Sequence, residues 1–377
     1  MQLSITEIGL ALSLSALVSA SICGLMIAAS RDIPRLSGRI DDIDALQSAH
    51  RRLTPRVGGL GIFAGLCSGL WIYGQSAGYN EATIWFAVLT GPILLTIVAL
   101  MEDLGFGIQA RGRLLATVAA SGIMGFSLDM WLPGLGLGYL DTYLSAPWLA
   151  IPITLFVTAA LAHGFNLIDG VNGLSSGVGA VGALSCSFIA LQVDAYEVAA
   201  VSFILGASIL GFLVFNFPFG WIFLGDTGAY LIGFTAAWLG IALINHEGQI
   251  TPWAIVLTFY WPLADVLFAV IRRGFKGQSL FEPDKLHLHT IVLRLLSAFK
   301  PTAGLNVRWR NPLATLVLLP FFIAPPIVGI SVYDNHVIAF AAVCSFTLVY
   351  GLGSILARPF LARIRTLLHR NVANKKS

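Results

Sequence analysis

The chain is a succession of long apolar segments separated by short polar connections. A transmembrane helix needs roughly twenty consecutive apolar residues, and eleven segments are of that length. They cover about 5–29, 58–78, 84–101, 114–131, 147–165, 175–193, 197–216, 227–245, 253–271, 312–332 and 337–357. The divisions at 194–196 and 333–336 are the least distinct, because those connections are short. The pattern predicts an all-α polytopic membrane protein with about eleven transmembrane helices.

Composition supports the same class. Of 377 residues, 57% are hydrophobic and only 11% are charged, whereas soluble domains carry about 25% charged residues. No charged stretch is long enough for a soluble domain, so we predict one integral membrane domain over 1–377. The four cysteines lie in apolar segments without metal-ligand spacing, which favours buried thiols. The first segment lacks a basic n-region and a cleavage site, so we interpret it as a retained helix.

The basic residues define an orientation. All 22 lie in four polar ranges, namely 30–57, 102–113, 272–311 and the tail 358–377. The connections on the opposite side contain carboxylates but no Lys or Arg. By the positive-inside rule the N-terminus is periplasmic and the tail is cytoplasmic. The number of spans is then odd, which fits eleven.

With this orientation, unusual polar groups gather at the cytoplasmic side. Five segments contribute them: His50–Gly59, Glu102–Asp103, His163–Leu174, Asn216–Asp226 and Pro283–His289. Asp265 lies two turns inside the ninth helix, ahead of two arginines. In the third segment a polar side chain recurs every three residues, at positions 163, 166, 169 and 172. Polar groups at membrane depth are functional by default, although a capped turn between two helices is the alternative. The pattern favours an active site at the cytoplasmic interface over a pore.

Several of these groups suit a divalent cation. Mg²⁺ takes one or two carboxylates and leaves its other positions to water and substrate phosphates. The candidate ligands are Asp103, Asn166, Asp169 and Asp226. Asp226 has a competing interpretation as the cap of the helix that starts there. Glu102 and Asp103 end a helix, where the macrodipole disfavours negative charge. Either they act as a metal ligand and a base, or Arg111 and Arg113 neutralise them.

The basic and histidine motifs suit anions. Three arginines within 50–56 fit phosphate or anionic headgroups, or serve only as a cytoplasmic anchor. His287 and His289 have no further ligands at zinc spacing, so they are solvated loop residues or phosphate contacts. Apolar positions in 288–299 recur at helical spacing, which predicts an interfacial amphipathic helix inside the loop 272–311.

Together and in this order, the motifs resemble the polyprenyl-phosphate N-acetylhexosamine-1-phosphate transferase family, also described as glycosyltransferase family 4. The family includes bacterial enzymes that start O-antigen synthesis and the peptidoglycan translocase. The resemblance covers about 50–290, and it is carried by Thr54–Gly59, Glu102–Asp103, Asn166–Leu174, Phe223–Tyr230 and Pro283–His289. Eleven spans and the histidine loop look more like the O-antigen branch.

The resemblance implies a reaction in the bacterial cytoplasmic membrane. Undecaprenyl phosphate would attack the β-phosphorus of a UDP-N-acetyl amino sugar, and UMP would leave. The implied cofactor is Mg²⁺, or Mn²⁺, and the implied partners are the two substrates and the bilayer, without nucleic acid. No covalent intermediate is needed, although attack by an Asp is a competing scheme. The sequence is compatible with a homodimer.

The resemblance also implies residue roles. Asp226 would be the main metal ligand with Asn166 beside it, and Asp103 with Glu102 would serve the lipid phosphate as base or second ligand. Asp169, assigned to the catalytic set, and Asn172 would contact the nucleotide. The remaining substrate-binding residues would be Thr54, Arg56, Arg113, Lys285, His287 and His289, the histidines holding the diphosphate.

Departures from the family pattern leave alternatives open. Glu102 replaces an Asp, His163 replaces a frequent Asn, Asn172 replaces a frequent Asp, and Thr290 stands where a third histidine is common. A homologue of reduced activity is therefore one alternative. A secondary transporter with ionisable residues near a cytoplasmic gate is another, but it predicts such residues at the bilayer midplane. A purely structural anchor leaves the five polar segments unexplained.

Overall fold

The fold is a bundle of helices. The computed structural model of the protein describes residues 5–36, 54–78, 88–246, 250–277, 287–298, 302 and 305–373. These residues form helices and no strand. The α-helices are α1 (Ile5–Ala29), α3 (Gly58–Ala77), α5 (Thr90–Asp103), α6 (Ala110–Leu128), α7 (Asp141–Leu144), α8 (Pro147–Ile168), α9 (Leu174–Gln192), α10 (Tyr196–Asn216), α11 (Gly225–Asn245), α12 (Pro252–Thr258), α13 (Tyr260–Lys276), α14 (Leu288–Ala298), α16 (Val307–Ser331) and α17 (His336–Ala373). The 3₁₀ helices are η1 (Pro34–Leu36) and η3 (Gly138–Leu140).

The prediction of an all-helical membrane protein is confirmed. Within the described residues, seven helices are long and apolar enough to cross a membrane, and they are α1, α8, α9, α10, α11, α16 and the first part of α17. An eighth span is added if α12 and α13, which meet at a 90° bend, count as one. The other three predicted segments fall on α3, α5 and α6. Positions 84–87 of one of them lie outside the described residues.

Helix α11 is the centre of the bundle. It packs against α3, α5, α8 and α9, and nearly all of its side chains are buried. A helix that is apolar on every side belongs in such a position. Its crossing with α3 depends on glycine, because a Cβ on Gly59 would lie 2.1 Å from the backbone nitrogen of Gly228. The central helix therefore begins in a fixed place, and the candidate site is built around that beginning.

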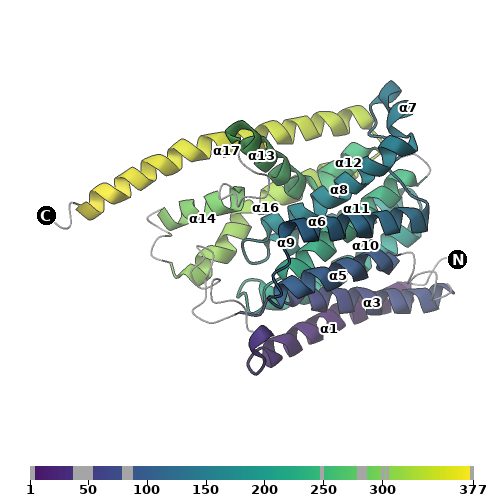
Figure 1. Ribbon diagram of the computed structural model, residues 1–377, viewed down its shortest axis with the longest axis horizontal. Helices are drawn as coiled ribbons and strands as arrows, with labels where there is room; N and C mark the ends of the chain where they lie inside the picture. Colours follow the sequence, from purple (N-terminus) through teal and green to yellow (C-terminus); the bar gives the residue numbers. More distant parts are fainter. Residues whose placement is uncertain are drawn as a thin grey trace.

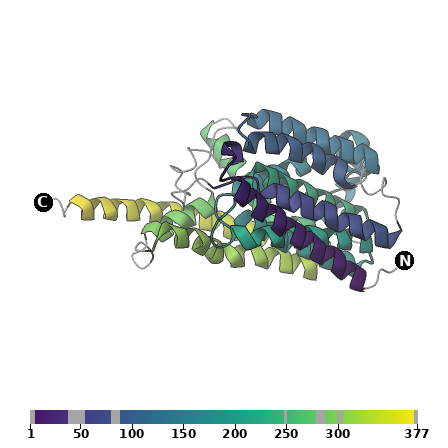
Figure 2. The same ribbon diagram turned by 90° about the horizontal axis from the view of Figure 1, so that it is seen from below.

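The start of α1 and the end of α17 lie at opposite ends of the bundle (Figure 1). Helix α17 continues past the other helices, and a second view shows the same projection (Figure 2). Helix α14 forms where the amphipathic helix was predicted, and it packs against α16 and α17. Helix α13 runs across the direction of the long helices (Figure 1). Its first turn contacts α8, since a Cβ on Gly164 would lie 2.9 Å from the carbonyl oxygen of Pro262.

Candidate active site

Two loops join at the start of α11. The N–H groups of Gly58 and Gly59 donate to the carbonyls of Phe223 and Leu224, both at 3.0 Å, and the N–H of Phe223 donates to the carbonyl of Pro55 at 2.8 Å. This backbone pairing joins the segment before α3 to the segment before α11. It places the arginine that follows Pro55 beside the first turn of α11.

Gly225 makes the turn into α11. Its φ is +72°, in the left-handed region that glycine adopts without strain. A Cβ there would lie 1.8 Å from the carbonyl oxygen of Arg56. No other residue fits this junction, and the next residue in the chain is Asp226.

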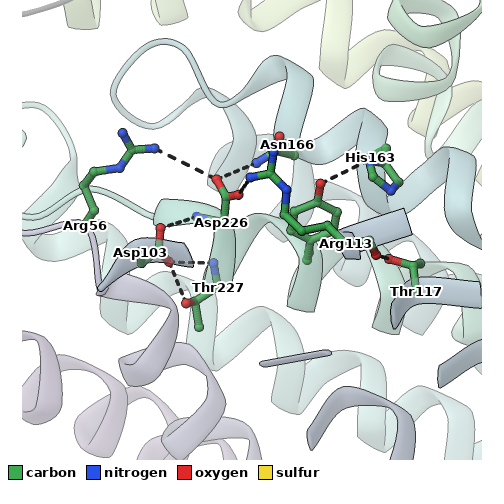
Figure 3. A network of polar contacts seen from close by, with 9 residues as sticks. Arg56, Asp103, Arg113, Thr117, His163, Asn166, Asp226 and Thr227 are labelled. Carbon is green, nitrogen blue, oxygen red and sulfur yellow. Dashed lines mark hydrogen bonds and ion pairs between the residues drawn. The ribbon is translucent and has the colours of Figure 1, made fainter. Parts of the chain in front are cut away.

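Asp226 receives polar side chains from three other segments (Figure 3). Its Oδ2 is ion-paired with Nη1 of Arg113, at the start of α6. Its Oδ1 accepts a hydrogen bond from Nδ2 of Asn166, near the end of α8, at 3.0 Å. Nη2 of Arg56 lies 4.0 Å from the same Oδ1. The predicted site residues Arg56, Arg113, Asn166 and Asp226 therefore lie together, although they are far apart in the sequence.

Asp103 caps α11 from the end of α5. Its Oδ1 accepts the N–H of Asp226 at 2.9 Å, and its Oδ2 accepts the N–H and the hydroxyl of Thr227 at 2.8 and 2.6 Å. The α11 helix thus obtains its cap from another helix, because the residue at its own N-cap position, Leu224, makes no side-chain cap bond and Asp226 lies in the first turn. The capping interpretation of Asp226 is wrong, because Asp103 fills that role. Glu102 precedes Asp103 on α5, half-buried.

A histidine and a tyrosine border the Asp226 cluster. The hydroxyl of Tyr230, one turn along α11, lies 3.0 Å from Nδ1 of His163 on α8. Their rings meet edge to face at 5.0 Å. His163 therefore bonds to the central helix in the position where a frequent Asn was expected. Its Nε2 is buried without a hydrogen-bond partner among the described residues.

Asp169 lies just beyond α8, three residues after Asn166. The pKa of its carboxyl is raised to about 7, mainly by burial; Arg56 opposes this shift, and the charges of Asp226 and Asp103 add to it. The charges of the Asp226 cluster therefore influence the protonation of Asp169.

Asn172 joins its own loop to neighbouring segments through hydrogen bonds. Its N–H donates to Oδ1 of Asn311 at 2.7 Å, and its Nδ2 donates to the carbonyl of Pro218 at 3.2 Å. Its carbonyl accepts the hydroxyl of Thr315 at 2.7 Å. The structure therefore gives Asn172 a structural role, and nucleotide contact stays a prediction. Thr54 lies half-buried at the start of its loop.

The predicted histidines form a second cluster with two residues that carry no predicted role. Nδ1 of His287 lies 2.6 Å from Oδ2 of Asp265 on α13, and Oδ1 of that carboxylate accepts the hydroxyl of Tyr350 on α17 at 2.5 Å. The ring of His289 stacks on that of His287 at 5.7 Å, with 5° between the planes. The pKa of His289 is lowered to about 4, mainly by burial; Asp265 opposes this shift, and His287 adds to it. Lys285 lies outside the described residues.

Sequence reasoning noted Asp265 but gave it no partner, and it missed Tyr350. A carboxylate inside an apolar helix was a usable signal, because such a group needs a donor. A tyrosine in a terminal apolar helix gives no comparable signal.

Comparison with known proteins places the chain among membrane transferases. Residues 85–244 match glycosyl transferase family 4. The chain is 30% identical over 279 residues to a decaprenyl-phosphate N-acetylglucosaminephosphotransferase of Mycobacterium tuberculosis, with 66% of this chain and 68% of that protein covered. It is 28% identical to a probable undecaprenyl-phosphate N-acetylglucosaminyl 1-phosphate transferase of Bacillus subtilis, with 68% and 71% covered. It is 27% identical to an undecaprenyl-phosphate alpha-N-acetylglucosaminyl 1-phosphate transferase of Salmonella typhi, with 86% and 87% covered.

Proposed function

Because the chain belongs to the polyprenyl-phosphate N-acetylhexosamine-1-phosphate transferase family, we propose that it transfers N-acetylated amino sugar 1-phosphate from a UDP-sugar to undecaprenyl phosphate. The products are UMP and a lipid-diphosphate sugar that starts a cell-surface polysaccharide such as O-antigen. The observation that carries the proposal is Asp226, a buried carboxylate held by two arginines and an amide at the junction of four segments. Buried charged groups converging in this way are typical of functional sites.

The donor set at Asp226 fits a magnesium ion, with Mn²⁺ as an alternative. Within the described residues no three His, Cys, Asp or Glu side chains come together as a metal site. Mg²⁺ does not need three, since one or two carboxylates with waters and substrate phosphates suffice. Asp226 supplies a carboxylate, and a half-turn of the adjacent Asn166 amide turns its oxygen toward the same place. When bound, the ion supplies Lewis-acid stabilisation of phosphate charge.

The reaction itself is a displacement at phosphorus. A phosphate oxygen of the lipid bonds to the β-phosphorus of the donor, and the bond from that phosphorus to the bridging oxygen breaks. The bridging oxygen leaves with UMP. Arg56 and Arg113, already at the Asp226 carboxylate, bind and orient the phosphates as these enter.

Asp103 supports this chemistry by fixing α11. Its two oxygens accept three hydrogen bonds from the first turn of that helix, so the position of Asp226 depends on it. The predicted roles of Asp103 as base or second metal ligand would use the lone pairs that remain. Glu102 and Asp169 complete the proposed catalytic set. The histidines His287 and His289 are proposed to hold the donor diphosphate.

We further propose eleven spans in the bacterial cytoplasmic membrane, with a periplasmic N-terminus and a cytoplasmic active site. The distribution of basic residues supports this orientation. The carboxylates of the first cluster lie at helix ends, Asp103 at the last residue of α5 and Asp226 in the first turn of α11. A transporter would place such groups midway along its helices.

The test is substrate turnover by the purified full-length protein in detergent. Undecaprenyl phosphate, MgCl₂ and a panel of UDP-N-acetyl amino sugars are supplied, and UMP is measured with and without the lipid. We expect lipid-dependent UMP release with at least one sugar, lost on chelation and restored by Mg²⁺. The proposal would be refuted by UMP release that does not depend on the lipid, or by no release with any sugar of the panel while the protein remains folded.

A further inference from the structure

A carboxylate deep in the protein joins three elements. Asp265, on α13, is fully buried, and each of its oxygens has a different donor. His287, just ahead of α14, bonds to one oxygen at 2.6 Å, and the hydroxyl of Tyr350 on α17 bonds to the other at 2.5 Å. A buried carboxylate is costly unless it is paired and hydrogen-bonded, so this arrangement is specific.

The pairing determines what His287 can do. Its Nδ1 is committed to Asp265, so only Nε2 remains for a ligand. A carboxylate on one ring nitrogen fixes the tautomer and orientation of an imidazole and makes the other nitrogen a better base. The parallel ring of His289 restricts the face of the same imidazole. The imidazole of His287 is therefore fixed at one edge by Asp265 and on one face by His289 before any substrate binds.

Tyr350 is itself held in place. Its ring meets that of Trp261 edge to face at 5.9 Å and lies 5.1 Å from the ring of Phe268 with 32° between the planes; both residues belong to α13, and Tyr350 is buried. The hydroxyl that supports Asp265 thus comes from a rigid contact between α13 and α17. Helix α17 lies well beyond residues 85–244, the part of the chain that matches the family.

This cluster is connected to the Asp226 site through α8. Gly164, two residues before Asn166, packs against Pro262, which is one turn before Asp265. A shift of α13 would therefore disturb both clusters. The contact between α13 and α8 also sets the orientation of His287 relative to α8, the helix that carries Asn166.

We propose that Asp265 and Tyr350 are positioning residues that orient His287 toward the donor diphosphate, which makes α17 a working part of the active site. The inference rests on the proposed function, in which His287 holds that diphosphate. Neither residue need touch a substrate.

The first experiment compares two tyrosines on the same helix contact. Tyr350→Phe removes only the hydroxyl that supports Asp265. Tyr260→Phe is the matched control, because the Tyr260 hydroxyl also links α13 to α17, through Thr347 at 3.3 Å, without bonding Asp265. We expect Tyr350→Phe to raise the KM for the UDP-sugar and to lower kcat/KM about ten-fold, and Tyr260→Phe to leave both nearly unchanged. Equal losses of kcat/KM with equal drops in the thermal midpoint would mean that both hydroxyls only pack α17, and would overturn the proposal.

The second experiment is a double-mutant cycle. Asp265→Asn alone should lower kcat/KM by roughly 10–100-fold. His287→Gln removes the imidazole and retains an amide donor for the buried carboxylate. If Asp265 acts through His287, adding Asp265→Asn to that variant should have little further effect. Full additivity would overturn the positioning role, and a fully active His287→Gln would overturn its premise. In either case, lipid-dependent UMP release by the wild type would leave the proposed function standing.

Discussion

The cap that α5 provides for α11 can be tested by removing one charge. Asp103→Asn keeps the size of the side chain but replaces one acceptor oxygen with an amide group. If the remaining oxygen keeps Thr227, the new NH₂ faces the N–H of Asp226, a donor against a donor. Loss of a hydrogen bond to a charged group costs about 1.5–3 kcal/mol. Loss of a negative charge at a helix N-terminus costs about 0.3–1 kcal/mol more. We therefore expect a decrease of about 2–4 kcal/mol in the free energy of unfolding.

The matched control is Glu102→Gln, which removes the same charge one residue earlier. The N–H groups of Asp226 and Thr227 donate to Asp103, so replacement of Glu102 leaves the cap in place and should cost much less. Both variants are unfolded thermally in detergent without substrate or metal, with intrinsic tryptophan fluorescence as the readout. A lowered midpoint for Asp103→Asn alone supports the cap. Unchanged stability of Asp103→Asn together with lost turnover would refute the cap and identify Asp103 as a group that acts in the reaction.

Three further outcomes follow from the geometry. Asp226→Asn should lower kcat at least about a hundred-fold, since loss of one preorganised charged group has that order of effect; full UMP release would remove Asp226 from the site. Gly59→Ala should cost at least about 1–3 kcal/mol by overpacking the contact with Gly228, whereas Gly122→Ala, on α6 with open space around it, should leave the unfolding midpoint unchanged or higher; equal midpoints would contradict the close crossing. The pKa of Asp169 is raised from 3.8 to about 7, so its stabilising contribution is complete below about pH 4 and lost as the pH rises through 7. In metal-free protein, wild type should gain stability over Asp169→Asn by about 1 kcal/mol per pH unit on going from pH 7 to pH 5, and a pH-independent difference in the melts would contradict this.

Much of the fold follows from the sequence, because apolar length alone defines helices that must satisfy their own backbone. The gathering of Asp103, Asn166 and Asp226 was anticipated from motifs at one end of the predicted spans, whereas Arg113 was expected at the substrate or beside Glu102 and Asp103. Which of these groups would bond to which was not predicted. Asp103 and Asp226 are separated by 123 residues, and nothing local indicates that one caps the helix of the other.

The bend between α12 and α13 was also missed. Residues 253–271 are apolar enough to look like one straight span, yet the helix breaks at Phe259 and turns by 90°. The break brings Asp265 to His287 and Tyr350, a tertiary arrangement that periodicity does not encode. Sequence patterns therefore predicted which groups carry chemistry better than they predicted what holds them.

The cap on α11 also limits how this site can receive anions. Many phosphate sites use the free amides at the beginning of a helix, which are rigid and uncharged. Here the amides of Asp226 and Thr227 are already taken by a protein carboxylate. An arriving pyrophosphate therefore depends on rotatable side chains, namely the two guanidinium groups at Asp226 and the imidazoles proposed to hold the diphosphate, or on a cation that it brings with it. Binding of this kind is adjustable. The site can therefore release the nucleotide once the pyrophosphate has been split and its charge is divided between the two products.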